Sequence, residues 1–163
     1  MKLHLWVFGL LFVFLGNISA QTWNTDVYAA LKQAQAQDKG ILLYFTGSDW
    51  CGWCKRLKSE VFETAEFKKF AASNLVLVEL DFPRNRAQSA AQKAANKKLA
   101  ENYKIEGYPT VILLDKFGRI RKRTGYQRGG PQPYINSLME AGDINWRTEG
   151  EPEKKKTDSP AKP

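Results

Sequence analysis

The chain alternates between segments with an apolar residue at every third or fourth position and short runs that are apolar throughout. The first segment of the helical kind carries Val27, Ala30, Leu31 and Ala34. Because this spacing places apolar side chains on one face, it predicts an amphipathic helix over about residues 26 to 38, with the Thr25 hydroxyl as its N-cap. The run from Ile41 to Thr46 is rich in branched and aromatic residues, which favours a strand covered on both faces.

The same alternation continues along the chain. Further helices are expected at residues 51–62, 64–70, 87–103 and 131–141, and further strands at 75–81, 110–114 and 119–124. The turn sequence Asp115-Lys116-Phe117-Gly118 joins the last two strands into a hairpin. Parallel strands joined by helices and followed by a hairpin predict one α/β domain, a three-layer sandwich in which a mixed β-sheet carries helices on both faces.

An uncharged apolar run precedes this domain. It spans the eleven residues from Leu5 to Leu15, follows Lys2 and ends near the small residue Ala20, which is the layout of a secretory signal peptide. A membrane-spanning helix needs ~20 apolar residues, so the run is too short to serve as one. We therefore expect residues 1–20 to be removed, leaving an exported chain, periplasmic or secreted, that is not inserted in the membrane.

The amino-acid composition indicates where the folded domain ends. Residues 147–163 hold no apolar side chain larger than Ala161, which predicts a disordered charged tail and leaves residues 21–146 as the folded domain. The one histidine, His4, falls in the expected signal peptide. The mature chain thus lacks a histidine for a catalytic triad or a metal site, and we expect neither a metal nor a cofactor.

The formal net charge is +8, from 25 Lys and Arg against 17 Asp and Glu. Arg119, Arg121 and Arg123 fall on the strand expected at the sheet edge, where cations discourage edge-to-edge pairing. We expect no nucleic-acid partner for an exported chain. A second interpretation of the charge is a basic surface that steers acidic partners.

The chain has two cysteines, Cys51 and Cys54, placed between a buried strand and a helix. Thiols three positions apart at a helix start can form a disulfide across one turn. Backbone N–H groups at that start, and the cations Lys55, Arg56 and Lys58, favour a thiolate at Cys51. Cys51 is therefore the candidate attacking sulfur, and Cys54, one turn further in, the candidate resolving sulfur.

Other uses of the two cysteines fit less well. A purely structural bridge across two residues removes little loop entropy and stabilises weakly. Zinc requires four ligands, and covalent haem attachment requires a histidine where this chain has Lys55. The pattern therefore favours a pair that opens and closes reversibly.

The segment Trp50-Cys51-Gly52-Trp53-Cys54-Lys55 resembles the active-site hexapeptide of the thioredoxin superfamily, in particular of exported thioredoxin-like proteins and of protein disulfide isomerase domains. Residues 103–110 resemble the segment that carries the family's cis-proline, and Gly125 matches a family glycine beside the active site. The resemblance covers about residues 23–141. It implies a thioredoxin-like sandwich and a monomeric thiol-disulfide oxidoreductase that reduces or exchanges disulfides of exported proteins and receives electrons from a membrane donor.

The resemblance also implies the residues that contact substrate, which are Trp50, Gly52, Trp53, Tyr108 and Pro109. A cis bond before Pro109 would expose the Tyr108 backbone for pairing with a substrate chain and place the proline against the disulfide. Trp50 is expected to be an exposed aromatic beside Cys51. The alternative function is a non-catalytic peptide-binding or chaperone module that uses the same aromatic surface.

Two departures from the family pattern stand out. Thioredoxin has a buried carboxylate in the strand before the motif, where this chain has Tyr44 and Phe45. Asp49 and Glu79, acting through water, are the candidates to replace it in proton transfer to Cys54. The stretch from residue 82 to 96 looks longer than its thioredoxin counterpart, which predicts a family-specific surface.

Overall fold

The computed structural model describes residues 22–142 and 144–147. They form a five-stranded mixed sheet in the order β1-β3-β2-β4-β5. The strands are β1 (Trp23–Asn24), β2 (Gly40–Thr46), β3 (Leu75–Asp81), β4 (Thr110–Leu114) and β5 (Ile120–Thr124). The first three are mutually parallel, whereas β4 is antiparallel to both β2 and β5. The sheet therefore has the mixed character that the sequence predicts.

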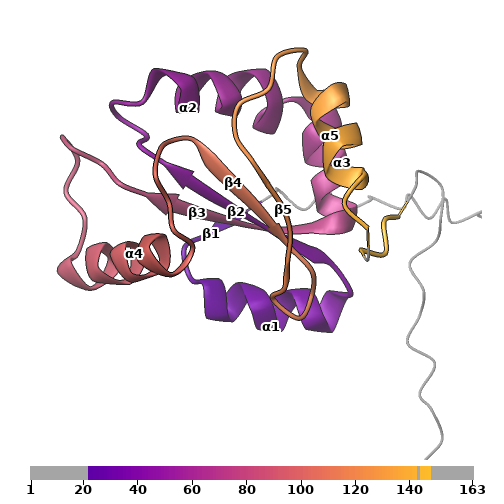
Figure 1. Ribbon diagram of the computed structural model, residues 1–163, viewed down its shortest axis with the longest axis horizontal. Helices are drawn as coiled ribbons and strands as arrows, with labels where there is room; N and C mark the ends of the chain where they lie inside the picture. Colours follow the sequence, from indigo (N-terminus) through magenta and orange to yellow (C-terminus); the bar gives the residue numbers. More distant parts are fainter. Residues whose placement is uncertain (1–21, 143, 148–163) are drawn as a thin grey trace, which may run out of the picture.

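Helices cover both faces of the sheet. They are α1 (Val27–Gln37), α2 (Gly52–Leu57), α3 (Ala65–Asn74), α4 (Ala90–Asn102) and α5 (Pro131–Met139), with a π-helical turn η1 (Lys58–Phe62) directly after α2. Helices α1 and α4 lie against one face, and α2, α3 and α5 lie against the other (Figure 1). The three-layer sandwich is confirmed. None of the helices in the described part of the chain has the length and apolar composition that crossing a membrane requires.

Three local predictions need correction. The N-cap of α1 is Asp26 rather than Thr25, because the Asp26 carboxylate accepts the N–H groups of Tyr28 and Ala29. The single helix expected over residues 51–62 is α2 followed by a π turn, in which the Glu63 N–H donates to the Lys58 carbonyl at 2.9 Å. Strand β1 was not expected, since two residues are too few to show an alternating pattern.

The two faces of the sheet carry different side chains. Beneath α2, α3 and α5 the core is aromatic around Phe62, whose ring centroid lies 4.8–5.8 Å from those of Trp23, Tyr44, Phe67 and Tyr134. On the other face, mainly aliphatic side chains of β2, β3 and β4 lie against α1 and α4. The aromatic half contains both cysteines, so the candidate site is part of the core rather than an addition to it.

The last described residues of the chain pack against α3. The backbone N–H of Arg147 donates to Asn74 at 2.6 Å, and the Trp146 ring lies 5.5 Å from that of Phe70. Arg147, which the composition assigns to the tail, therefore contacts the folded domain. The rest of the expected tail and the expected signal peptide lie outside the described residues.

A carboxylate closes the β4–β5 hairpin. Asp115 accepts the backbone N–H groups of Phe117 and Arg119 at 2.9 and 3.0 Å, and its Oδ2 lies 2.7 Å from the guanidinium groups of Arg119 and Arg121. Burial opposes ionisation, but these donors outweigh it and lower the pKa of Asp115 to about 2. A carboxyl whose pKa is lowered on folding stabilises the fold above its unfolded pKa and loses that effect as the pH falls.

We therefore expect Asp115→Asn to lower the free energy of unfolding at pH 7 by about 2 kcal/mol. The difference from wild type should narrow to about half by pH 3, because the pKa of Asp115 falls from 3.8 to about 2 on folding. Urea denaturation of both proteins at several pH values measures this difference in unfolding free energy. Asp38→Asn is the control, since the Asp38–Lys116 pair is exposed and should contribute under about 1 kcal/mol. A loss of unfolding free energy in Asp115→Asn that does not change with pH would contradict the lowered pKa of Asp115 as its cause.

Candidate active site

The disulfide lies where the carboxyl end of β2 leads into α2. Cys51 and Cys54 are bonded, with their Cα atoms 5.2 Å apart. Cys51 is the N-cap of α2, and its sulfur accepts the backbone N–H of Cys54 at 3.2 Å. Cys51 is 6% exposed and Cys54 is 1% exposed. The first sulfur is therefore both the more accessible one and the one that faces the helix N-terminus.

The two tryptophans of the motif differ in exposure. Trp53 is half exposed and its ring lies 5.0 Å from that of Tyr126. Trp50 is largely covered: its indole N–H donates to the Phe82 carbonyl at 2.8 Å, and its ring meets Tyr108 edge-on at 5.6 Å. The expectation that Trp50 is exposed is wrong, because the segment after β3 supplies an acceptor for its N–H. The exposed tryptophan of the pair is Trp53.

Gly52 and Pro109 frame the remaining part of the site. A side chain at Gly52 would meet no atom within 4 Å, so the space in front of the first turn of α2 is open. The Tyr108–Pro109 bond is cis, as the motif implies. Tyr108 packs against the core cluster that contains both cysteines. The contact of Pro109 itself with the disulfide stays a prediction.

Gly125 packs closely against the backbone of Pro109. A Cβ at this position would lie 2.9 Å from the Pro109 carbonyl oxygen, which is closer than real Cβ atoms approach a backbone atom. Gly125→Ala should therefore displace the segment before β4 and slow disulfide reduction. Gly107→Ala is the matched control, because a Cβ there meets nothing within 4 Å. Rates on a protein disulfide measure the effect, and equal rates for the two variants would contradict it.

Tyr44, one of the two residues at the position where the family carboxylate is expected, contacts Cys54 directly. The Tyr44 hydroxyl donates to the Cys54 carbonyl at 2.9 Å. Burial, reinforced by Glu79 and Asp81 and opposed by a hydrogen bond with Thr46, raises the pKa of Tyr44 to about 12. Tyr44 thus remains a neutral donor at physiological pH. It fixes the first turn of α2 on the sheet.

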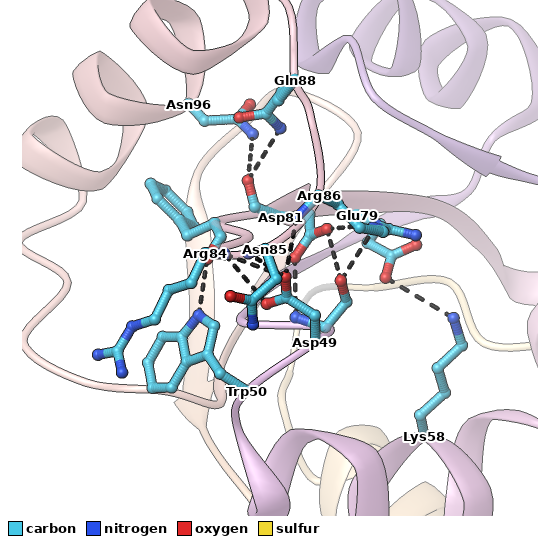
Figure 2. Close-up of polar contacts among 12 residues, drawn as sticks. Asp49, Trp50, Lys58, Glu79, Asp81, Arg84, Asn85, Arg86, Gln88 and Asn96 are labelled. Atoms are coloured by element: carbon cyan, nitrogen blue, oxygen red, sulfur yellow. Dashed lines mark hydrogen bonds and ion pairs between the residues drawn. The ribbon is translucent and has the colours of Figure 1, made fainter.

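The two candidate proton-transfer acids occupy different surroundings, as Figure 2 shows. Glu79 is the register partner of Tyr44 on β3, and one of its oxygens lies 3.7 Å from the Lys58 Nζ. The Asp49 carboxylate instead accepts backbone N–H groups from residues 84, 85 and 86 at 2.6–3.2 Å. These bonds outweigh desolvation and lower the pKa of Asp49. Asp49 is therefore an anchor for this segment.

All three cations expected to assist Cys51 contact other groups. Arg56 pairs with Glu60 at 2.9 Å, and Lys58 with Glu79. Lys55 donates to the Asp49 carbonyl at 3.0 Å. The helix N-terminus and its N–H groups are therefore the main local support for a thiolate. Within residues 22–142 and 144–147, no group of three or more His, Cys, Asp or Glu side chains is arranged to hold a metal ion.

Several residues at the site carry no signal in the sequence alone. Tyr126 donates its hydroxyl to Glu60 at 2.6 Å, and the guanidinium of Arg56 lies 5.3 Å from the Trp53 ring. On the other side of the site, the Arg84 guanidinium lies 3.9 Å from the Trp50 ring. An arginine guanidinium therefore lies near each tryptophan ring. The Tyr126–Glu60 and Arg84–Trp50 contacts join residues that are distant in the sequence, so no local pattern indicates them. Arg56 and Trp53, by contrast, are three positions apart on α2.

Comparison with known proteins agrees with this geometry. The thioredoxin-like domain family matches residues 27–134. Over 125 residues the chain is 36% identical to the disulfide bond reductase DsbH of Chlamydia pneumoniae, which covers 76% of this chain and 75% of that protein. It is 33% identical over 103 residues to the thioredoxin-related protein DsbJ of the same organism, which covers 63% of this chain and 30% of DsbJ.

Solved structures give the same result. A DsbH oxidoreductase superposes with a TM-score of 0.69 at 34% identity, covering 82% of this chain and 93% of the other. A thioredoxin from Thermus thermophilus superposes with a TM-score of 0.55 at 16% identity, covering 74% and 86%. The second likeness shows the fold alone.

Proposed function

This chain belongs to the thioredoxin-like domain family, and from that premise we propose that it is an exported protein-disulfide oxidoreductase that works through Cys51 and Cys54. The observation that carries the proposal is the position of Cys51, whose sulfur caps α2 and accepts the Cys54 N–H. The 36% identity to a protein named disulfide bond reductase supports reduction as the direction. The residues that hold substrate in this proposal are Trp50, Gly52, Trp53, Tyr108 and Pro109.

Reduction proceeds by two exchange steps. The Cys51 thiolate attacks one sulfur of the substrate disulfide, forming a mixed disulfide and releasing a substrate thiolate that takes up a proton. Deprotonated Cys54 then attacks the Cys51 sulfur and releases the second substrate thiolate, which is also protonated. Two electrons and two protons reach the substrate, and the protein is left with the Cys51–Cys54 bond. A dithiol donor at the membrane must reduce that bond before the next cycle.

Magnitudes indicate which contact matters most to the attacking sulfur. A helix N-terminus stabilises a nearby anion by about 0.3–1 kcal/mol. A hydrogen bond from a neutral donor to a charged acceptor contributes about 1.5–3 kcal/mol. The N–H of Cys54, 3.2 Å from the Cys51 sulfur, is thus the larger contribution to thiolate stability.

The proposal that the chain is exported is based on the N-terminal apolar run and not on the folded domain. Residues 1–20 would direct the chain to the periplasm or the exterior, where disulfides of exported proteins are the available substrates. Residues 21–146 would form the active domain and residues 147–163 its charged tail. We propose that the mature protein acts as a monomer.

Reduction of insulin disulfides by dithiothreitol tests the proposal. The wild-type protein should accelerate the precipitation of insulin chains. A protein carrying both Cys51→Ser and Cys54→Ser should act no faster than dithiothreitol alone. Equal acceleration by both proteins would reject the enzyme and favour a peptide-binding module that uses the exposed Trp53 surface.

A further inference from the structure

The segment after β3 is held in place through its main chain. The Asp49 carboxylate accepts the backbone N–H groups of Arg84, Asn85 and Arg86, as Figure 2 shows. Asp81, at the end of β3, accepts the N–H and hydroxyl of Ser48 and the guanidinium of Arg86. The path of residues 84–86 is therefore fixed by two carboxylates at the base of the active-site loop.

This anchoring places one arginine on the tryptophan beside Cys51. The Trp50 ring cannot turn freely, because its N–H is bonded to the Phe82 carbonyl and its ring packs nearly perpendicular to that of Tyr108. The guanidinium carbon of Arg84 lies 3.9 Å from the centre of the Trp50 ring, which is stacking distance. A stacked guanidinium keeps its N–H donors around the rim of the ring, where a planar anion can reach them.

Arg84 differs from the neighbouring arginines in its charge pairing. Its neighbour Arg86 is paired with Asp81 at 2.7 Å, and Arg56, beside Trp53, is paired with Glu60. The Arg84 side chain is exposed and has no carboxylate partner among the described residues. Two arginines thus lie against the two tryptophans of the motif. Within the described part of the chain, Arg56 has a carboxylate partner and Arg84 has none.

From these contacts, and resting on the proposed function, we propose that Arg84 is a specificity-determining residue. Its guanidinium binds the carboxylate of an Asp or Glu that lies within a few residues of the substrate cysteine. A substrate chain that brings its disulfide to Cys51 passes Trp50, the preceding residue, so an acidic side chain on that chain meets Arg84. The preferred substrates are exported proteins whose reducible disulfide is flanked by acidic residues.

Two peptides test this inference. Each contains one disulfide, and they differ only in Asp or Asn beside the cysteines. The readout is the ratio of kcat/KM for the Asp peptide to that for the Asn peptide, because a general loss of activity cancels in this ratio. An exposed charge pair changes the ratio by about 1.4- to five-fold, so we expect a preference for the Asp peptide within that range for wild type at low salt. In about 0.5 M salt the ratio should approach one.

The variants separate charge recognition from structure. Arg84→Gln keeps the backbone N–H that Asp49 binds, so the segment stays anchored, and the ratio should fall to about one. Arg84→Glu should bring it below one. Lys68→Gln, which removes one exposed positive charge on α3, should keep the wild-type ratio. An unchanged ratio in both Arg84 variants would overturn the inference, whereas wild type that reduces neither peptide would instead count against the proposed function.

Discussion

Cys54→Ala should turn the protein into a trap for its substrates. Cys51 keeps its place at the start of α2, so it can still attack a disulfide and form the mixed disulfide. With no second thiol to attack the Cys51 sulfur, the adduct persists and turnover stops. Non-reducing electrophoresis and intact-mass measurement, after mixing the reduced variant with a disulfide substrate, should show a covalent adduct that dithiothreitol removes.

Cys51→Ala is the matched control for this experiment. Its remaining thiol, on Cys54, is 1% exposed, against 6% for Cys51, and lies one turn inside the helix. A substrate disulfide cannot reach that sulfur without opening the site, so we expect little adduct. Equal trapping by the two single variants would refute the assignment of attacking and resolving roles.

The largest effect on stability is expected at Phe62. This ring is 1% exposed and contacts Trp23, Tyr44, Phe67 and Tyr134, so it joins β1, β2, α3 and α5. Phe62→Ala would leave a cavity among rings that cannot collapse onto one another, at a cost of about 3–5 kcal/mol. Urea denaturation followed by circular dichroism measures the loss.

Phe117→Ala supplies the comparison, because this ring is 61% exposed at the tip of the β4–β5 turn. Its removal should change the free energy of unfolding by no more than about 0.5 kcal/mol. A deficit below about 1 kcal/mol for Phe62→Ala would mean that the aromatic cluster is not the main support of this half of the core.

The elements with sharp local signals were predictable from the sequence. β3 begins and ends at Leu75 and Asp81, as expected, because the polar residues Asn74 and Asp81 bound a mainly apolar run. α3 begins at Ala65, one residue after the start of the helix expected over residues 64–70. The π turn was not predictable. Val61 and Phe62 are adjacent in the sequence and both are buried. In the sequence alone, two adjacent apolar residues at this point fit a π turn and an irregular helix end equally well.

The candidate site was predictable as far as its motif extends. The cysteine pair and the cis bond at Pro109 follow from resemblance to a known pattern. The burial of Trp50 and the position of Arg84 could not be predicted in this way. They depend on Asp49, which binds the main-chain N–H groups of residues that lie 35 to 37 positions further along the sequence. Every residue except proline offers such a group, so the bonds leave no trace in the choice of side chains.

This anchoring also bears on how the protein can diverge. Since Asp49 binds the peptide backbone of residues 84–86, the side chains of Arg84 and Asn85 can be exchanged while the course of the segment stays the same. Arg86 differs, because its guanidinium also binds Asp81. A single codon change at Arg84 would alter which proteins are favoured without disturbing the sulfur chemistry beside it. Selectivity and reactivity can thus evolve separately, and libraries restricted to positions 84 and 85 offer a direct route to engineered variants with altered targets.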